Sequence, residues 1–463
     1  MIAALRCIAL ALLLCSPVAC TQESADEELA VDILAELIAI NTAPSGGNDT
    51  RAAVAALVGH LRTAGFGDDE IFVLAETEKL ANLVVRYPSR EPAQKPLLLM
   101  AHLDVVEAKR EDWSVNPFVL TEREGFYYGR GATDNKAGAA MLIANFIRLR
   151  REGFEPDRDL VIMLTADEES TGNAAQWLLA QHRALVDAEF ALNTDGGLVM
   201  FRDGAPRAFL MQTAEKIFVS FTFEATDPGG HSSLPRADSA ISRLARALVD
   251  LHHHRFPIDL NETTRAFLTR SAALASPDDK VLLEALVGDR RDDEFEERLA
   301  AAPYYNALAR TTCVATQLSG GHAENALPQT ARAVVNCRVL PQSSAAAAKA
   351  SLEELATPHA VTVTQVAEAK PSPPSPLDEK IVGPLSKLAS EMWPGIVVIP
   401  EMSTGATDGL FVRRVGIPVY GVSAIAMDPD DIRAHGRDER ISERAFHDAQ
   451  EFWYRLVKAY SAR

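Results

Sequence analysis

Residues 97–104 read LLLMAHLD, an apolar run that ends on His102 and Asp104. The same arrangement returns over residues 160–169, where LVIMLTADEE ends on Asp167, Glu168 and Glu169. Short unbroken apolar runs are typical of strands that are buried in a parallel sheet. Imidazole and carboxylate groups are metal ligands, and α/β sheets place their ligands where such strands end. The two runs therefore predict an α/β fold with a metal site at one edge of its sheet.

Strands and helices alternate around these two runs. Further strand-like runs lie at 82–87 and 190–193, and helical spacing is found at 31–61, 137–151 and 174–182, with a loop at 41–47. Alternating strands and helices predict a sheet with helices on both faces.

The pattern changes near residue 212. Residues 218–224 alternate with a period of two, and strands at 313–318, 331–340 and 361–366 accompany helices at 240–252 and 345–355. This pattern predicts an inserted α+β domain with an antiparallel sheet. A proline-rich segment at 371–376 precedes strands at 397–400 and 417–422 and a helix at 443–460. We therefore expect a catalytic domain formed by 24–212 and 369–463, with a lid domain at 213–368.

Composition excludes several classes of partner. The 463 residues include 47% hydrophobic and 24% charged ones, as in ordinary globular proteins. A formal net charge of -18 argues against binding to nucleic acid or to an anionic membrane. No interior apolar run is long enough to span a bilayer.

The first 20 residues have the pattern of a secretory signal peptide. Arg6 precedes an apolar stretch at 8–14, and small residues follow up to Cys20. Val18 and Ala19 favour cleavage that leaves a lipid-bearing Cys20, whereas Pro17 does not fit such a site well. Lipid anchoring and plain periplasmic export both stay open, and a buried first helix is the alternative to a leader. Residues 24–30 are expected to form a short polar tether.

Two of the five cysteines lie outside the leader, Cys313 and Cys337. Both fall in strand-like apolar runs. They can pair in an oxidising compartment or stay as two buried thiols.

Eight short motifs carry a family resemblance. They are His102-x-Asp104, Gly129-Arg130-Gly131 with Asp134-Asn135-Lys136, Asp167-Glu168-Glu169, Asp195-Gly196-Gly197, Gly229-Gly230-His231-Ser232, Asn325-Ala326-Leu327-Pro328, Thr407-Asp408 and His435-Gly436-Arg437-Asp438-Glu439. In this order they resemble the di-zinc aminoacylase and carboxypeptidase family of metallopeptidases. Its members include glutamate carboxypeptidase, acetylornithine deacetylase, succinyl-diaminopimelate desuccinylase, carboxypeptidase S and aminoacylase-1. The resemblance implies a zinc-exopeptidase-like mixed sheet flanked by helices, with a ferredoxin-like lid that forms a homodimer.

The resemblance also implies the metal ligands. His102, Asp134 and Asp195 would bind one Zn²⁺, and Asp134, Glu169 and His435 would bind the other, with Co²⁺ or Mn²⁺ as alternatives. Asp134 would bridge the two ions, and the family tends to have a cis peptide after this position. Taken alone, Asp195 before two glycines would also fit a simple turn.

Three further residues would act in catalysis. Glu168 would be the general base and acid for a metal-bound hydroxide. Asp104 would accept the second ring N–H of His102 and fix its tautomer. His231 would reach the active site of the partner subunit and polarise the scissile carbonyl. Taken alone, His231 would also fit a turn cap.

Four residues match positions that contact substrate in the family. Asn325 and Arg338 would hold polar groups, Arg338 through a terminal carboxylate. Gly405 and Thr407 would line the other side of the substrate. The family resemblance thus implies hydrolysis of an amide beside a free carboxylate, in a small peptide or an N-acyl amino acid. A non-catalytic ligand-binding protein and a cell-envelope scaffold are the alternatives, and Glu168 argues against both, since neither needs a base beside the metals.

Overall fold

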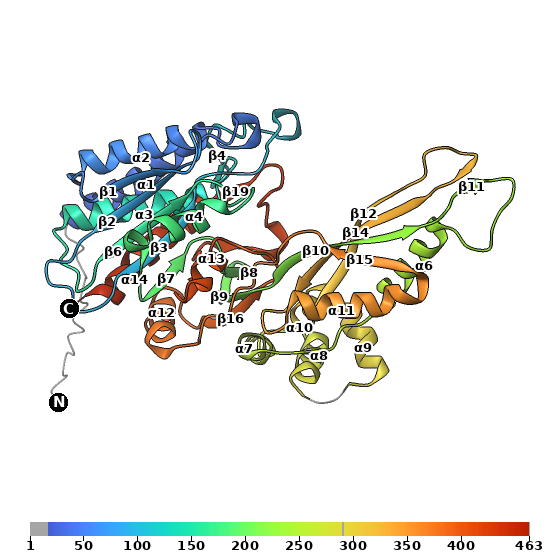
Figure 1. The fold of residues 1–463 in the computed structure, drawn as a ribbon. Helices are drawn as coiled ribbons and strands as arrows, with labels where there is room; N and C mark the ends of the chain where they lie inside the picture. Colours follow the sequence, from blue (N-terminus) through green and yellow to red (C-terminus); the bar gives the residue numbers. More distant parts are fainter. Residues whose placement is uncertain (1–16, 289–290, 463) are drawn as a thin grey trace, which may run out of the picture.

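The computed structural model describes residues 17–288 and 291–462, and they form a catalytic domain and a lid (Figure 1). The predicted leader therefore lies largely outside the described residues. Within those residues, no helix is long and apolar enough to cross a membrane.

The catalytic domain is built on a ten-stranded mixed sheet in the order β1-β2-β6-β3-β7-β17-β9-β8-β18, with β16 paired to β9. The strands are β1 (Ile71–Ala75), β2 (Ala81–Tyr87), β3 (Leu97–His102), β6 (Leu160–Thr165), β7 (Phe190–Asn193), β8 (Leu198–Arg202), β9 (Ala205–Glu215), β16 (Val397–Ser403), β17 (Val419–Gly421) and β18 (Ala426–Met427). The neighbours β6, β3, β7 and β17 run parallel, so their carboxyl ends meet at one edge. A small sheet of β4 (Thr121–Arg123), β5 (Phe126–Tyr128) and β19 (Arg440–Ser442) lies beside it.

Helices cover both faces of this sheet, as the alternation predicts. One face packs on α1 (Pro17–Ala39), α2 (Arg51–Thr63), α3 (Lys136–Arg151), α12 (Glu379–Met392) and α14 (Glu443–Ser461). The other packs on α4 (Asn173–Gln181), α5 (Arg183–Val186) and α13 (Gly409–Arg414). In β3, Leu97 and Leu99 enter the first core, whereas Leu98 and Met100 enter the second. A strand that is buried on both faces must be apolar throughout, which explains the unbroken run.

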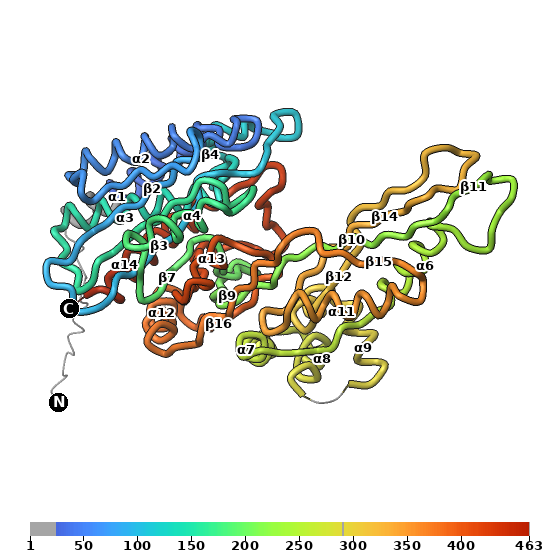
Figure 2. Tube along the Cα trace, in the orientation of Figure 1, coloured from blue at the N-terminus to red at the C-terminus, as the bar shows by residue number. Residues whose placement is uncertain are grey.

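The lid projects from the catalytic domain as a four-stranded antiparallel sheet in the order β12-β14-β10-β15 (Figure 2). It comprises β10 (Ile217–Thr226), β12 (Thr312–Gly320), β14 (Thr330–Val339) and β15 (Val361–Gln365), and its core packs against α6 (Ala240–His253) and α11 (Ala345–Ala356). The short strands β11 (Gly230–His231) and β13 (Ala326–Leu327) pair at its far end. Cys313 and Cys337 lie opposite each other on β12 and β14 and form a disulfide, which resolves the alternative that the sequence leaves open.

Two features differ from the sequence-based expectations. The tether predicted at 24–30 is wrong, because this segment belongs to α1, where Ala30 is buried and the Asp26 carboxylate pairs with Arg148 and Arg151. Four helices were also not anticipated: α7 (Glu262–Ser271), α8 (Pro277–Val287), α9 (Asp293–Ala300) and α10 (Pro303–Ala309). Of these, α7 packs on β16, and the four helices share a separate core with residues of β9 and β16.

Glu401 on β16 lies near Tyr304 of this helical cluster, and burial raises the pKa of Glu401 from 4.5 to about 7. The stability that this raised pKa confers is present below pH 4.5 and is lost as the pH rises through 7. Glu401→Gln should remove this dependence. Between pH 5 and pH 8, the wild type should lose about 1–3 kcal/mol more of its free energy of unfolding than the variant loses. Urea unfolding at the two pH values measures it, with the exposed Glu284→Gln as control. An equal loss of unfolding free energy in wild type and Glu401→Gln between the two pH values would contradict the prediction.

Candidate metal centre

The five predicted ligands converge at the carboxyl edge of the parallel strands. His102 ends β3, Glu169 follows β6, and Asp195 follows β7. Asp134 lies in the loop between β5 and α3, and His435 in the loop between β18 and β19. Neighbouring parallel strands bring the first three together, and the two loops add the others.

Two overlapping trios place their ligand atoms within 4.8 Å of one another: His102, Asp134 and Asp195, and Asp134, Glu169 and His435. The Asp134 carboxylate faces both histidines, with Oδ1 2.9 Å from His102 Nε2 and Oδ2 3.1 Å from His435 Nε2. His435 Nε2 also lies 2.9 Å from Glu169 Oε1. The peptide between Asp134 and Asn135 is cis, as the family resemblance implies. A third trio of His102, Glu168 and Glu169 shows that Glu168 lies within reach of the same centre.

The electrostatics of the cluster fit divalent cations. Burial and the charge of Asp134 raise the pKa of Asp195 to about 8. Burial and the charge of Asp195 raise the pKa of Glu168 well above its usual range. Hydrogen bonds to Asp134 and Glu169 raise the pKa of His435 to about 10. The raised pKa values of Asp195 and Glu168 reflect negative charge that is costly to bury, whereas hydrogen bonds from His102 and His435 lower the pKa of Asp134 despite its burial. A mixed imidazole and carboxylate set of this kind suits Zn²⁺ and similar metal ions.

Asp104 makes different contacts from those expected. The backbone carbonyl of Asp104, not its carboxylate, is the nearest partner of His102 Nδ1, at 2.9 Å, and the carboxylate lies 3.6 Å away. The carboxylate instead accepts the backbone N–H groups of Glu168 and Glu169, at 3.0 and 2.9 Å. Asp104 thereby fixes both glutamates at the end of β6 as well as the orientation of His102.

Glu439 has a structural role that sequence reasoning missed. This fully buried carboxylate accepts backbone N–H groups from Gly131, Thr133 and Asp134, at 3.1, 2.7 and 3.1 Å. It also pairs with Arg130 Nη1 at 2.6 Å. Glu439 therefore ties the loop of His435 to the loop of Asp134. Arg130 and Glu439 each belong to one of the eight motifs, but they are 309 positions apart in the chain, and no local pattern reveals that they form an ion pair.

His231 and Asn325 lie together in the lid. The N–H of Ser232 donates to the Asn325 carbonyl oxygen at 3.0 Å, and both predicted residues are exposed. Figure 1 shows β11, which contains His231 and pairs with β13 directly after Asn325, at the end of the lid that is remote from the catalytic domain. Within one chain, the structure does not bring His231 to the metal centre.

The remaining predicted substrate residues lie closer to the junction of the domains. Arg338 packs its guanidinium 4.8 Å from the Phe218 ring, and no carboxylate among the described residues pairs with it. The Gly405 N–H donates to Ser403 Oγ at 3.0 Å. The Thr407 hydroxyl is already engaged, because it donates to Glu215 Oε1 at 2.6 Å. Arg338 is therefore the predicted substrate residue whose charge is available to bind an anionic group of the substrate.

Comparison with known proteins agrees with this arrangement. The family described as "Peptidase family M20/M25/M40" matches residues 98–459. The human N-fatty-acyl-amino acid synthase/hydrolase PM20D1 is 30% identical over 380 residues, which cover 80% of this chain and 74% of that protein. Aminoacylase-1 of Pongo abelii is 27% identical, covering 89% of this chain and 91% of that protein.

Solved structures share the fold. The M20 family metallo-carboxypeptidase Sso-CP2 from Sulfolobus solfataricus superposes with a TM-score of 0.68 at 18% identity, covering 93% of this chain and 99% of that chain. The family match extends over most of the sequence and includes all five residues of the two trios, from His102 to His435. The chain is therefore a member of peptidase family M20/M25/M40, a metal-dependent hydrolase of the carboxypeptidase or aminoacylase type.

Proposed function

We propose that this protein is a di-zinc amidohydrolase that cleaves the amide bond of an N-acyl amino acid, next to the free carboxylate. One observation carries the proposal: two trios of metal-binding groups share Asp134, and Glu168 lies beside them. The choice of an acyl amino acid over a small peptide rests on relatives whose names specify acyl amino acid substrates.

The residues of the two trios would hold the zinc ions in the arrangement that the resemblance implies. When bound, zinc supplies Lewis acidity and lowers the pKa of water to about 7. Glu168 would take a proton from the attacking water and pass it to the leaving amine. Its backbone is held by Asp104, which keeps the carboxylate at a fixed place beside the cluster.

Arg338 would bind the substrate carboxylate. Its guanidinium is partly buried without a carboxylate partner, and a planar guanidinium can form two parallel hydrogen bonds to a carboxylate. A carboxylate on the α-carbon that is bonded to the scissile amide nitrogen is the feature that N-acyl amino acids and C-terminal peptide residues share.

A panel of N-acyl amino acids and dipeptides, assayed with added zinc, tests the proposal. We expect N-acyl amino acids to be hydrolysed, and their amides and methyl esters, which lack the free carboxylate, to be poor substrates. Faster turnover of dipeptides would favour a carboxypeptidase instead. If no compound of the panel is hydrolysed, the result would favour a non-catalytic binding protein.

We also propose that the protein is exported, on the evidence of its leader-like first 20 residues, and that it forms a homodimer through the lid. In the dimer, His231 would complete the partner's active site, since the tip of the lid is remote from the metal centre of its own chain.

His231→Ala is expected to lower kcat by about 10²–10³-fold, because a donor aimed at the developing oxyanion is lost. The metal content should not change. Steady-state kinetics measure the loss, and His252→Ala, another exposed lid histidine, is the matched control.

Mixing His231→Ala with Glu168→Gln tests whether the histidine acts across the dimer. A mixed dimer has one site with both groups intact, so part of the activity should return on subunit exchange. If mixed dimers form and stay inactive, His231 does not act on the partner's site.

A further inference from the structure

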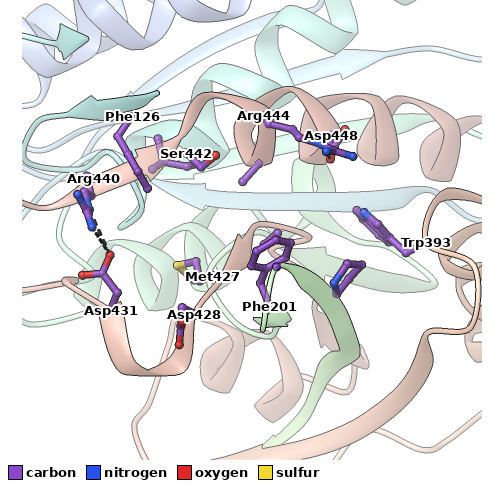
Figure 3. Close-up of a pocket in the computed structure, with 15 residues that line it drawn as sticks. Phe126, Phe201, Trp393, Met427, Asp428, Asp431, Arg440, Ser442, Arg444 and Asp448 are labelled. Carbon is purple, nitrogen blue, oxygen red and sulfur yellow. Dashed lines mark hydrogen bonds and ion pairs between the residues drawn. The ribbon is translucent and has the colours of Figure 1, made fainter. Parts of the chain in front are cut away.

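A cavity of about 400 Å³ lies beside α14 and is walled in part by aromatic side chains (Figure 3). None of the residues of the metal cluster lines it. Arg440 pairs with Asp431 of the same wall at 2.6 Å. Arg444 pairs with Asp448, which also lines the cavity, at 3.4 Å. Both cations of this cavity are therefore already paired, and the ion pair whose contacts lead to the metal cluster lies elsewhere, at the end of β9.

Glu215, the last residue of β9, is a buried carboxylate with a buried cation beside it. Its Oε1 lies 3.0 Å from Nη1 of Arg413 on α13. The same oxygen accepts the Thr407 hydroxyl at 2.6 Å and the Gln212 side-chain amide at 2.9 Å. Burying a charge is costly unless it is paired and hydrogen-bonded, so these three contacts hold the carboxylate in one place.

Arg413 is in turn attached to the central sheet. Its Nη2 donates to the Val419 carbonyl oxygen on β17 at 2.9 Å, and its Nε donates to Ser375 Oγ at 3.1 Å. Strand β17 pairs with β7, the strand that Asp195 follows. The ion pair is therefore fixed to the strand next to the one that leads to this predicted ligand.

Thr407 connects the ion pair to Asn193, which holds the backbone of Asp195. Asn193 Nδ2 lies 3.4 Å from Thr407 Oγ1 and donates to the Asp195 carbonyl oxygen at 3.0 Å. Asn193 Oδ1 accepts the Asp195 N–H at 3.1 Å. Gly196 and Gly197 follow with φ of 140° and 66°, a conformation that favours glycine, and they offer no side chain to hold the loop. The contacts with Asn193 therefore set the position of Asp195.

We propose that Glu215 is a positioning residue for the metal cluster. Its contacts run through Thr407 and Asn193 to Asp195, and they set the direction in which the Asp195 carboxylate meets the metal ion. This role rests on the proposed function, because it takes Asp195 as a zinc ligand. It also assigns the Thr407 hydroxyl to this path instead of to a direct contact with substrate.

Thr407→Val tests the path, because valine keeps the shape of threonine and leaves the Glu215–Arg413 pair in place. The change is made in the His435→Ala background, where the trio of Asp195 stays complete and the other proposed zinc trio is broken. Zinc-loaded full-length protein is dialysed against chelator-buffered Zn²⁺, and bound zinc is measured by elemental analysis. Zinc affinity should fall about 10–100-fold, the usual effect of losing an outer contact to a metal ligand.

Three controls separate positioning from a general loss of structure. In the His102→Ala background the other trio keeps its ion, and Thr407→Val should leave that affinity unchanged. Thr407→Ser retains the hydroxyl and should bind zinc as its parent does. Glu215→Gln in the His435→Ala background should lose less affinity than Thr407→Val, because its amide oxygen can still accept the hydroxyl although it no longer pairs with Arg413.

The outcomes distinguish this role from the proposed function. Equal weakening by Thr407→Val in both backgrounds would make the residue a general structural one and overturn the proposal. Unchanged zinc affinity in both backgrounds would also overturn it, and a raised KM would then return the hydroxyl to substrate contact. Wild type that binds fewer than two ions would contradict the di-zinc function, and wild type that binds none would contradict both.

Discussion

Glu168→Gln is expected to lower kcat by about 10²–10⁴-fold, the range that a general base commonly contributes. Glutamine keeps the shape of the side chain but cannot take a proton from water. The backbone hydrogen bond from Glu168 to Asp104 does not involve the altered group, so the local fold should persist. Steady-state kinetics on the best acyl amino acid measure the effect.

The neighbouring residue supplies the contrast for this prediction. Glu169→Gln should lose metal as well as activity, because Glu169 faces both His435 and the shared Asp134. Glu168→Gln should retain two metal ions per chain by elemental analysis. Since Glu168 also falls in a trio with His102 and Glu169, loss of metal from Glu168→Gln would make it a ligand and remove its role as base.

Removal of metal by a chelator is expected to reduce activity to the uncatalysed level. Without a cation, nothing polarises the substrate carbonyl or lowers the pKa of water, and the raised pKa of Glu168 favours a protonated carboxyl group that cannot take a proton from water. Zinc, cobalt or manganese should restore turnover, with two ions bound per chain. Activity and metal content are followed together during dialysis and reloading.

His435→Ala distinguishes two cooperating ions from one. This change removes one group from the second trio and none from the first, so one ion per chain should stay bound. Full turnover with a single ion, or with none, would contradict the di-zinc proposal.

The fold and the location of the site could be predicted from particular residues. The unbroken run that ends on His102 predicts a strand that is covered on both faces, and Leu97 and Leu98 do enter opposite cores. The motif order predicts the family, which the match over residues 98–459 confirms. The helices α7–α10 carry no motif, and they share a core with β9 and β16, which lie far from them in the chain, so no local pattern predicts where they pack.

The sequence by itself predicted the buried strands and a metal site where they end, and the family resemblance implied which groups would bind the metal. Residue type and local apolar pattern are properties of short segments, so His102, Glu169 and Asp195 could be placed at strand ends without coordinates. Tertiary structure decided which distant segments meet. Only the folded chain pairs Glu439 with Arg130, turns the Asp104 carboxylate to the backbone of Glu168, and sets His231 at the far end of the lid. These arrangements depend on how separate elements pack. Buried polar groups need hydrogen-bond partners, but elements far apart in the chain can supply them, so no local pattern specifies which groups meet.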